Sequence, residues 1–238
     1  MNAPTAATMT ANVARLDLYG PIHKGLRLCM TDTLVKVGSL DVTDSAELSA
    51  TLAQVQQLLD VCRGHLDHEN HFVHTAIEAR RPGASSRIAG EHEAHLDAIA
   101  ALEGDAAALR ALPGPAASHR FYRHLALFVA ENFEHMNVEE TTLNPLLWAA
   151  YSDEELEVIH QRLVASIAPA EMALVLRWMV PALSPAERSA MLGAMQQQMP
   201  PAALQAVLDT VRPHLPDAAW GKLTRALGVP PVPGLMNI

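Results

Sequence analysis

Residues 65–69 of the chain read His-Leu-Asp-His-Glu, and residues 135–139 read His-Met-Asn-Val-Glu. In each stretch a histidine precedes a glutamate by four residues. On a helix this spacing puts both side chains on one face, about one turn apart. A neutral imidazole and a carboxylate placed in this way can bind one metal ion together. The pairs His65/Glu69 and His135/Glu139 therefore predict a metal site between helices.

Apolar residues on both sides of these pairs recur with helical spacing, and Gly- or Pro-containing breaks separate four helices within the first 150 residues. The predicted helices span residues 21–38, 46–80, 86–103 and 116–143, with a connection over residues 104–115 and a break at Asn144-Pro145. Short connections between consecutive helices favour an up-down-up-down four-helix bundle. The sequence thus predicts an all-α fold with this bundle over residues 19–150.

The two ends of the chain differ from the bundle. Residues 1–18 lack periodicity and are expected to form a flexible N-terminus. After residue 151 the chain changes to shorter helical segments rich in Met, Leu and Ala, and two of them open with the capping-box pattern Ser-x-x-Glu. We expect residues 151–238 to form a C-terminal helical extension or subdomain whose methionines pack rather than bind a metal.

Two more helices carry a histidine at the matching depth. In an up-down-up-down bundle, the starts of the first and third helices share one end with the ends of the second and fourth. His23 lies near the start of the first helix and His92 in the first half of the third, whereas both His-x-x-x-Glu pairs lie in the later halves of their helices. The predicted metal ligands are therefore His23, His65, Glu69, His92, His135 and Glu139.

The energetics agree with this assignment. Glu69 and Glu139 lie on helix faces that also carry Phe72 and Phe128. An unpaired ionised carboxylate in an apolar core costs several kcal/mol. A bound metal would offset this cost, whereas without a metal the two carboxyl groups should face water or bind a proton.

Composition excludes several classes of partner. The net charge is -9 with only 17 Lys and Arg, which argues against binding to nucleic acid or to an anionic membrane. No apolar run reaches the roughly 18 residues needed to cross a bilayer, and the first residues lack the pattern of a signal peptide. Cys29 and Cys62 do not make a disulfide framework. We therefore expect a cytoplasmic protein with reduced thiols.

Other histidines have simpler interpretations. His74 and Glu78 form a third pair of the same spacing, but His74 follows His65 by nine residues, which places it on the opposite helix face, so we expect it at the surface. His124 shares the face of His135 but lies three turns away, too far to bind the same ion. The sequence leaves open whether His68 and His95 are extra ligands, hydrogen-bond donors or surface residues. His119, His160 and His214 are expected at the surface.

Residues 21–150 resemble the hemerythrin-like (HHE cation-binding) domain. The matching stretches are IHKGLR around His23, HLDHENHF around His65, GEHEAHL around His92 and HMNVEETTLNPLLW around His135. The resemblance implies a left-handed four-helix bundle that holds two iron ions with an oxo or hydroxo bridge. Carried over position by position, it assigns the ligand roles to the six residues named above.

The chain also departs from the oxygen-carrying members of that family. They have a second histidine four residues after the first on the third helix, where this chain has Leu96, and His95 stands one residue early. Their carboxylate on the fourth helix is an Asp five residues after the histidine, where this chain has Glu140, whereas Glu139 gives a four-residue spacing. One histidine fewer leaves a more open coordination position, which favours sensing, redox chemistry or a labile metal over oxygen carriage.

Three functions follow as hypotheses. The first is a non-haem di-iron protein that binds or senses oxygen, nitric oxide or the redox or iron state. The second is a di-iron oxidoreductase such as an oxidase or peroxidase. Ferritin-like di-iron sites need two Glu-x-x-His motifs. This sequence has one, Glu157-x-x-His160, and it lies outside the bundle, which argues against that class of oxidoreductase. The third is a helical interaction protein with a structural metal or none, whose C-terminal helices bind a protein partner or a second copy. Mn and Zn also suit the predicted ligands.

Overall fold

The structure, a computed structural model, describes residues 15–231, and within this range it contains helices and no strand, which confirms the all-α prediction. The bundle and the segments at its end are α1 (Gly20–Gly38), α2 (Ser45–His68), η1 (Glu69–His74), α3 (Thr75–Arg80), α4 (Ser86–Ala111), α5 (Pro115–Val138), η2 (Glu139–Leu143) and α6 (Asn144–Ala150). The later elements are α7 (Asp153–Ser166), α8 (Pro169–Ala182), α9 (Pro185–Gln198), α10 (Pro201–Val211), η3 (Arg212–His214) and α11 (Asp217–Leu227).

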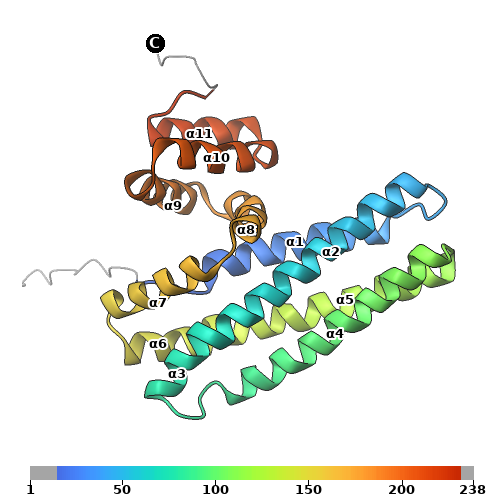
Figure 1. Cartoon of the computed structure of the whole chain (residues 1–238), viewed down its shortest axis with the longest axis horizontal. Coiled ribbons are helices and arrows are strands. Elements are labelled where there is room, and N and C mark those ends of the chain that lie inside the picture. The colour runs from blue at the N-terminus through green and yellow to red at the C-terminus, as the bar shows by residue number, and fades with distance from the viewer. Residues whose placement is uncertain (1–14, 232–238) are drawn as a thin grey trace, which may run out of the picture.

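The four long helices form a bundle in which each helix contacts two others. The contacting pairs are α1 with α2, α1 with α5, α2 with α4, and α4 with α5. Figure 1 shows that α1 and α4 begin at the end where α2 and α5 finish, next to α3 and α6. Buried side chains at helical spacing, such as Leu26 and Met30 on α1 and Phe121 and Phe128 on α5, fill the space between the helices.

The third helix is longer than the sequence predicted. We expected it to end at Glu103, but α4 continues through Gly104 to Ala111. A single glycine costs a helix only about 1 kcal/mol relative to alanine. Leu109 is completely buried in the bundle core, and its burial offsets that cost.

The predicted break at Asn144-Pro145 is also wrong. The helical run continues from α5 through η2 into α6, and Pro145 lies in the first turn of α6. Proline is tolerated at the first turn of a helix because its missing N–H would have no partner there. The change from π-helical to α-helical hydrogen bonding creates such a first turn inside a continuous helix.

The segments after residue 151 build a second apolar cluster on one side of the bundle. α8 lies against α1 and α2, and α9, α10 and α11 pack beyond it (Figure 1). Ser152 and Ser184 cap α7 and α9 through complete capping boxes. The methionines of this region, among them Met179 and Met191, pack in the second cluster as predicted.

Residues 15–18, which the sequence assigned to a flexible segment, are held against the bundle. The Arg15 guanidinium donates to the carbonyl oxygens of Trp148 and Tyr151 and to the Asp153 carboxylate, which it meets at 2.7 Å. Residues 1–14, where the rest of that prediction falls, lie outside the described residues.

No single helix among residues 15–231 is both long enough and apolar enough to cross a membrane. α7 and α8 meet that test only as a pair, and the chain bends by 116° between them.

Candidate metal centre

The structure brings all six predicted ligands together at the end of the bundle near α3 and α6. They form two overlapping groups of side chains that could each hold a metal ion, and the donor atoms within a group lie within 4.8 Å of one another. The first group is His23, His65, Glu69 and Glu139, and the second is Glu69, His92, His135 and Glu139. Both glutamates therefore belong to both groups.

In the first group, each histidine has a carboxylate oxygen at close range. His65 Nε2 lies 3.3 Å from Glu69 Oε1, one turn further along the same helix. His23 Nε2, which comes from α1, lies 3.4 Å from Glu139 Oε2 and 3.7 Å from Glu69 Oε1. These separations are those expected between ligand atoms about 2 Å from a shared ion.

The second group uses the other oxygen of each glutamate. His135 Nε2 lies 3.3 Å from Glu139 Oε1, and His92 Nε2 lies 3.6 Å from both Glu69 Oε2 and Glu139 Oε1. The Nε2 atoms of His92 and His135 are 3.0 Å apart. Each carboxylate thus offers one oxygen to each group, which is the arrangement of a carboxylate that bridges two ions.

The donor atoms are buried, and several have no hydrogen-bond partner. These unpaired atoms are His23 Nε2, His65 Nε2, Glu69 Oε2 and both carboxylate oxygens of Glu139. A buried polar atom without a partner costs about 1–3 kcal/mol, and a charged one costs more. The unpaired atoms are the ones a metal would take as ligands, so these residues fit a metal cation.

The pKa values of these buried groups also fit a site for a cation. Burial and the nearby charge of Glu139 raise the pKa of Glu69 to about 8. Burial also opposes ionisation of Glu139, but the His135 and His92 imidazoles hold its pKa well below the usual range. Burial lowers the pKa of His65, which keeps this imidazole neutral and able to bind a cation.

Both glutamates stand at the first residue of a π-helical segment. Glu69 opens η1 and Glu139 opens η2, and each segment interrupts a long α-helix. A π-helix bonds residue i to i+5, so it takes in more residues per turn and changes which side chains face the core after it. Neither segment was predicted from the sequence, because side-chain periodicity gives little signal for a single π-helical turn.

Hydrogen bonds from outside the cluster orient three of the histidines. The Nδ1–H of His23 donates to Glu140 Oε1 at 2.9 Å, and Arg27 on α1 donates to the same oxygen at 2.6 Å. Glu140 therefore positions His23 and is absent from both ligand groups. A carboxylate at Nδ1 fixes the ring orientation and leaves Nε2 free for the metal.

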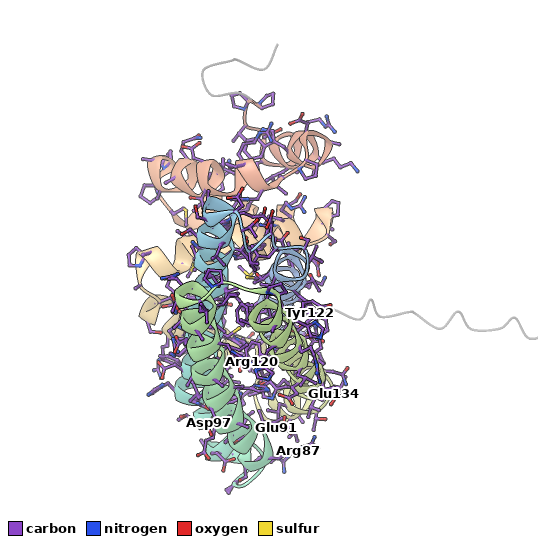
Figure 2. The ribbon with its side chains drawn as sticks, turned by 90° about the vertical axis from the view of Figure 1, so that its right-hand side faces the viewer. Arg87, Glu91, Asp97, Arg120, Tyr122 and Glu134 are labelled. Atoms are coloured by element: carbon purple, nitrogen blue, oxygen red, sulfur yellow. The ribbon has the colours of Figure 1, made fainter. Side chains whose placement is uncertain are left out.

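The same arrangement recurs at the second group. The Nδ1–H of His135 donates to Glu91 Oε2 at 2.9 Å, and Arg87 donates to the other Glu91 oxygen at 2.9 Å. Arg87 and Glu91 are both on α4 and are labelled in Figure 2. The Nδ1–H of His92 donates to the Asn70 side-chain oxygen at 2.8 Å. These partners were not predicted from the sequence, because all three contacts run between different helices.

The structure corrects the prediction that His74 lies at the surface. His74 is the last residue of η1 and is buried, with its ring stacked on His92 at 4.8 Å between centroids. The nine-residue count from His65 assumed an α-helix throughout, and the π-helical turn reduces the rotation over this interval. Burial lowers the pKa of His74 to about 4, so its imidazole is neutral.

The structure also places the histidines whose role was open. His68 points toward the C-terminal segments, where its Nε2 lies 3.1 Å from Glu171 on α8. His95 is buried beside Phe128 and His135 and belongs to neither ligand group. Leu96, at the position where oxygen carriers have their extra histidine, is 40% exposed. His124 pairs with Asp105 on the surface, as expected from its distance.

Fold and site together define the class: a helical-bundle protein that binds a metal cation between its four long helices. The family model of the hemerythrin HHE cation-binding domain matches residues 25–147, slightly more than half of the chain. The chain belongs to this family. Searches of curated proteins and of solved structures found no match.

Proposed function

We propose that the chain is a non-haem di-iron protein that binds or senses oxygen, nitric oxide or the redox or iron state. The observation that carries the proposal is the sharing of Glu69 and Glu139 between two ligand groups. Two bridging carboxylates and two histidines per group suit a pair of ions rather than one. Mixed imidazole and carboxylate ligands suit iron, and they also suit Mn and Zn.

The number of protein ligands favours a responsive centre over an oxygen carrier. Each group offers four side chains, and neither Leu96 nor His95 adds a fifth. An oxo or hydroxo bridge would complete part of the coordination of both ions and still leave an open position. When bound, a pair of iron ions supplies electrons and positions at which a diatomic ligand can bind.

The ligand assignment is tested by His65→Ala. We expect this variant to lose most of its bound metal, because His65 is one of four side chains in the first group and its Nε2 has no other partner. His160→Ala is the matched control, since His160 is an exposed histidine outside both groups. Elemental analysis of protein purified without added metal gives the metal content, and an ultraviolet-visible spectrum reports an oxo-bridged iron pair.

The outcomes separate the hypotheses. About two iron ions per chain, with a spectrum that changes on adding oxygen or nitric oxide, would support the proposal. Equal metal content in His65→Ala and His160→Ala would overturn the ligand assignment. A full complement of zinc in place of iron would refute the redox function and leave a structural metal.

A further inference from the structure

Three polar side chains next to the metal centre, toward the end of the bundle, are buried. They are Tyr19, His74 and Asn144, which are 1%, 5% and 2% exposed. None of the three belongs to either ligand group. We call these three residues the end layer.

The register of the helices puts the end layer one turn beyond the ligands. Tyr19 precedes His23 by four residues, and their rings lie 5.4 Å apart. His74 follows Glu69 by five residues and Asn144 follows Glu139 by five, which is one turn of a π-helix in both cases. Tyr19 therefore adjoins the first ligand group, and His74, stacked on His92, adjoins the second.

The polar atoms of the end layer have no partner in the protein. Tyr19 Oη, both ring nitrogens of His74 and Asn144 Oδ1 are buried and form no hydrogen bond. The orientation of the Asn144 side-chain amide is fixed, because its NH₂ group donates to Asp17 Oδ1 at 2.7 Å. Its carbonyl oxygen is therefore the atom left free.

Apolar side chains surround Tyr19 in the end layer. Val73, Ile77 and Leu143 are buried in one cluster with Tyr19, and Leu147 and Leu156 belong to the same cluster. These residues offer no hydrogen-bond partner.

The side of the centre that faces the middle of the bundle has fewer unpaired polar atoms. His95 lies there between His135 and Phe128, and one of its ring nitrogens is unpaired. Asn132 on the same side is satisfied, since its amide donates to the Phe128 carbonyl oxygen at 2.8 Å. Leu26, Cys62 and other core side chains make the rest of that side apolar.

We propose that the end layer is the pocket for the exogenous ligand of the metal centre, and that it takes a small ligand carrying a proton, the class that includes water and hydrogen peroxide. The inference rests on the metal centre proposed above and narrows the ligand proposed there, because oxygen and nitric oxide carry no proton. The Tyr19 hydroxyl and an N–H of the His74 ring each provide a donor. Asn144 Oδ1 provides only an acceptor, so a ligand without a proton leaves it unpaired.

Azide binding to the iron-loaded protein tests the pocket. Azide accepts hydrogen bonds, and its absorption band with ferric iron gives a dissociation constant without turnover. We expect Tyr19→Phe and His74→Phe each to weaken azide binding by about tenfold, the usual effect of one hydrogen bond to a charged group. His95→Phe is the matched control, because it is also a buried histidine against a ligand ring, and it should change the dissociation constant by less than about twofold.

The proton requirement is tested with Asn144→Leu and two probes. This variant should leave azide affinity within about twofold of the parent protein but slow the spectral change on adding hydrogen peroxide by about tenfold. An equal response of both probes to Asn144→Leu would refute the ligand class. A loss of azide affinity in His95→Phe but not in Tyr19→Phe or His74→Phe would overturn the pocket and place the ligand toward the middle of the bundle.

Metal content keeps the two proposals separate. Iron is measured in every variant before azide is added. Absence of iron from the parent protein would refute the proposed function itself. Full iron content with no azide binding in the parent protein would overturn only the pocket.

Discussion

Glu140 and Glu91 each adjoin a proposed ligand in the chain, yet each hydrogen-bonds to a histidine on another helix. Glu140 follows Glu139 and accepts from His23, and Glu91 precedes His92 and accepts from His135. An arginine holds each carboxylate in place. The two candidate ligand groups therefore have matching supports, which keep both Nδ1 atoms occupied and both Nε2 atoms directed at the centre.

Glu140→Gln tests this support at the scale of one residue. The amide keeps the size of the side chain but loses the charge that pairs with Arg27 and the second acceptor oxygen. We expect metal affinity to fall by about 10- to 100-fold, the usual effect of losing such a partner. Competition with a chelator of known affinity gives the value.

Glu134→Gln is the control for this experiment. Glu134 lies in α5, just before η2, and is exposed, so its amide variant should bind metal like the parent protein. Equal affinity in both variants would show that the contact between Glu140 and His23 has no influence on the metal.

At the scale of elements, α8 is the helix that joins the C-terminal segments to the bundle. It packs against α1 at Gly25, where an added Cβ would lie 2.7 Å from the Met179 Cα atom. The atom it would meet belongs to the backbone, so a side chain at residue 25 requires the two helices to separate. Arg188 supports α8 by donating to the carbonyl oxygens of Val180, Pro181 and Leu183 at its C-terminal end.

Gly25→Ala should therefore destabilise the protein. Forcing a methyl group into this contact costs about 1–3 kcal/mol in the free energy of unfolding. Alanine recovers part of that by its higher helix propensity, so the net loss is at the lower end of the range. Denaturant titration measures the change.

Gly104→Ala is the matched variant, because it makes the same substitution inside α4, where an added Cβ meets nothing within 4 Å. It should raise the free energy of unfolding by about 0.5–1 kcal/mol through helix propensity alone. If both substitutions stabilised the protein to the same degree, the close contact between α1 and α8 would be refuted.

At the scale of the whole molecule, the metal centre lies where all four long helices meet. Several of its buried carboxylate oxygens and imidazole nitrogens have no hydrogen-bond partner. A ligand that binds only the folded state stabilises it by about 2.7 kcal/mol at 100 times its dissociation constant. We therefore expect metal binding to stabilise the folded bundle.

Removal of the metal with a chelator should lower the melting temperature of the parent protein, as followed by circular dichroism. His65→Ala, which is expected to bind little metal, should melt at a temperature that the chelator hardly changes. A melting temperature of the parent protein that is the same with and without chelator would contradict this expectation.

Several features of this protein followed from the sequence alone, because they depend on local spacing. Helical periodicity predicted the four long helices and their order, and the depth of His23, His65, His92 and His135 along them predicted that they meet at one end. Helix ends were less predictable. Gly104 and Pro145 were predicted to be helix breaks, but the helices continue past both residues. Burial of Leu109 stabilises the helix after Gly104, and a π-helical turn precedes Pro145.

The tertiary structure alone decided which side chains surround the six proposed ligands. Because of the π-helical turn after Glu69, His74 lies beside the centre and not at the surface as expected. Tyr19 and Asn144 are also buried there, in the end layer. The pairing of Glu140 with His23 and of Glu91 with His135 joins helices that are distant in the chain. Periodicity gives the face and depth of a residue on its own helix. The rotation of a helix about its axis and its neighbours across the bundle depend on how all the helices pack together.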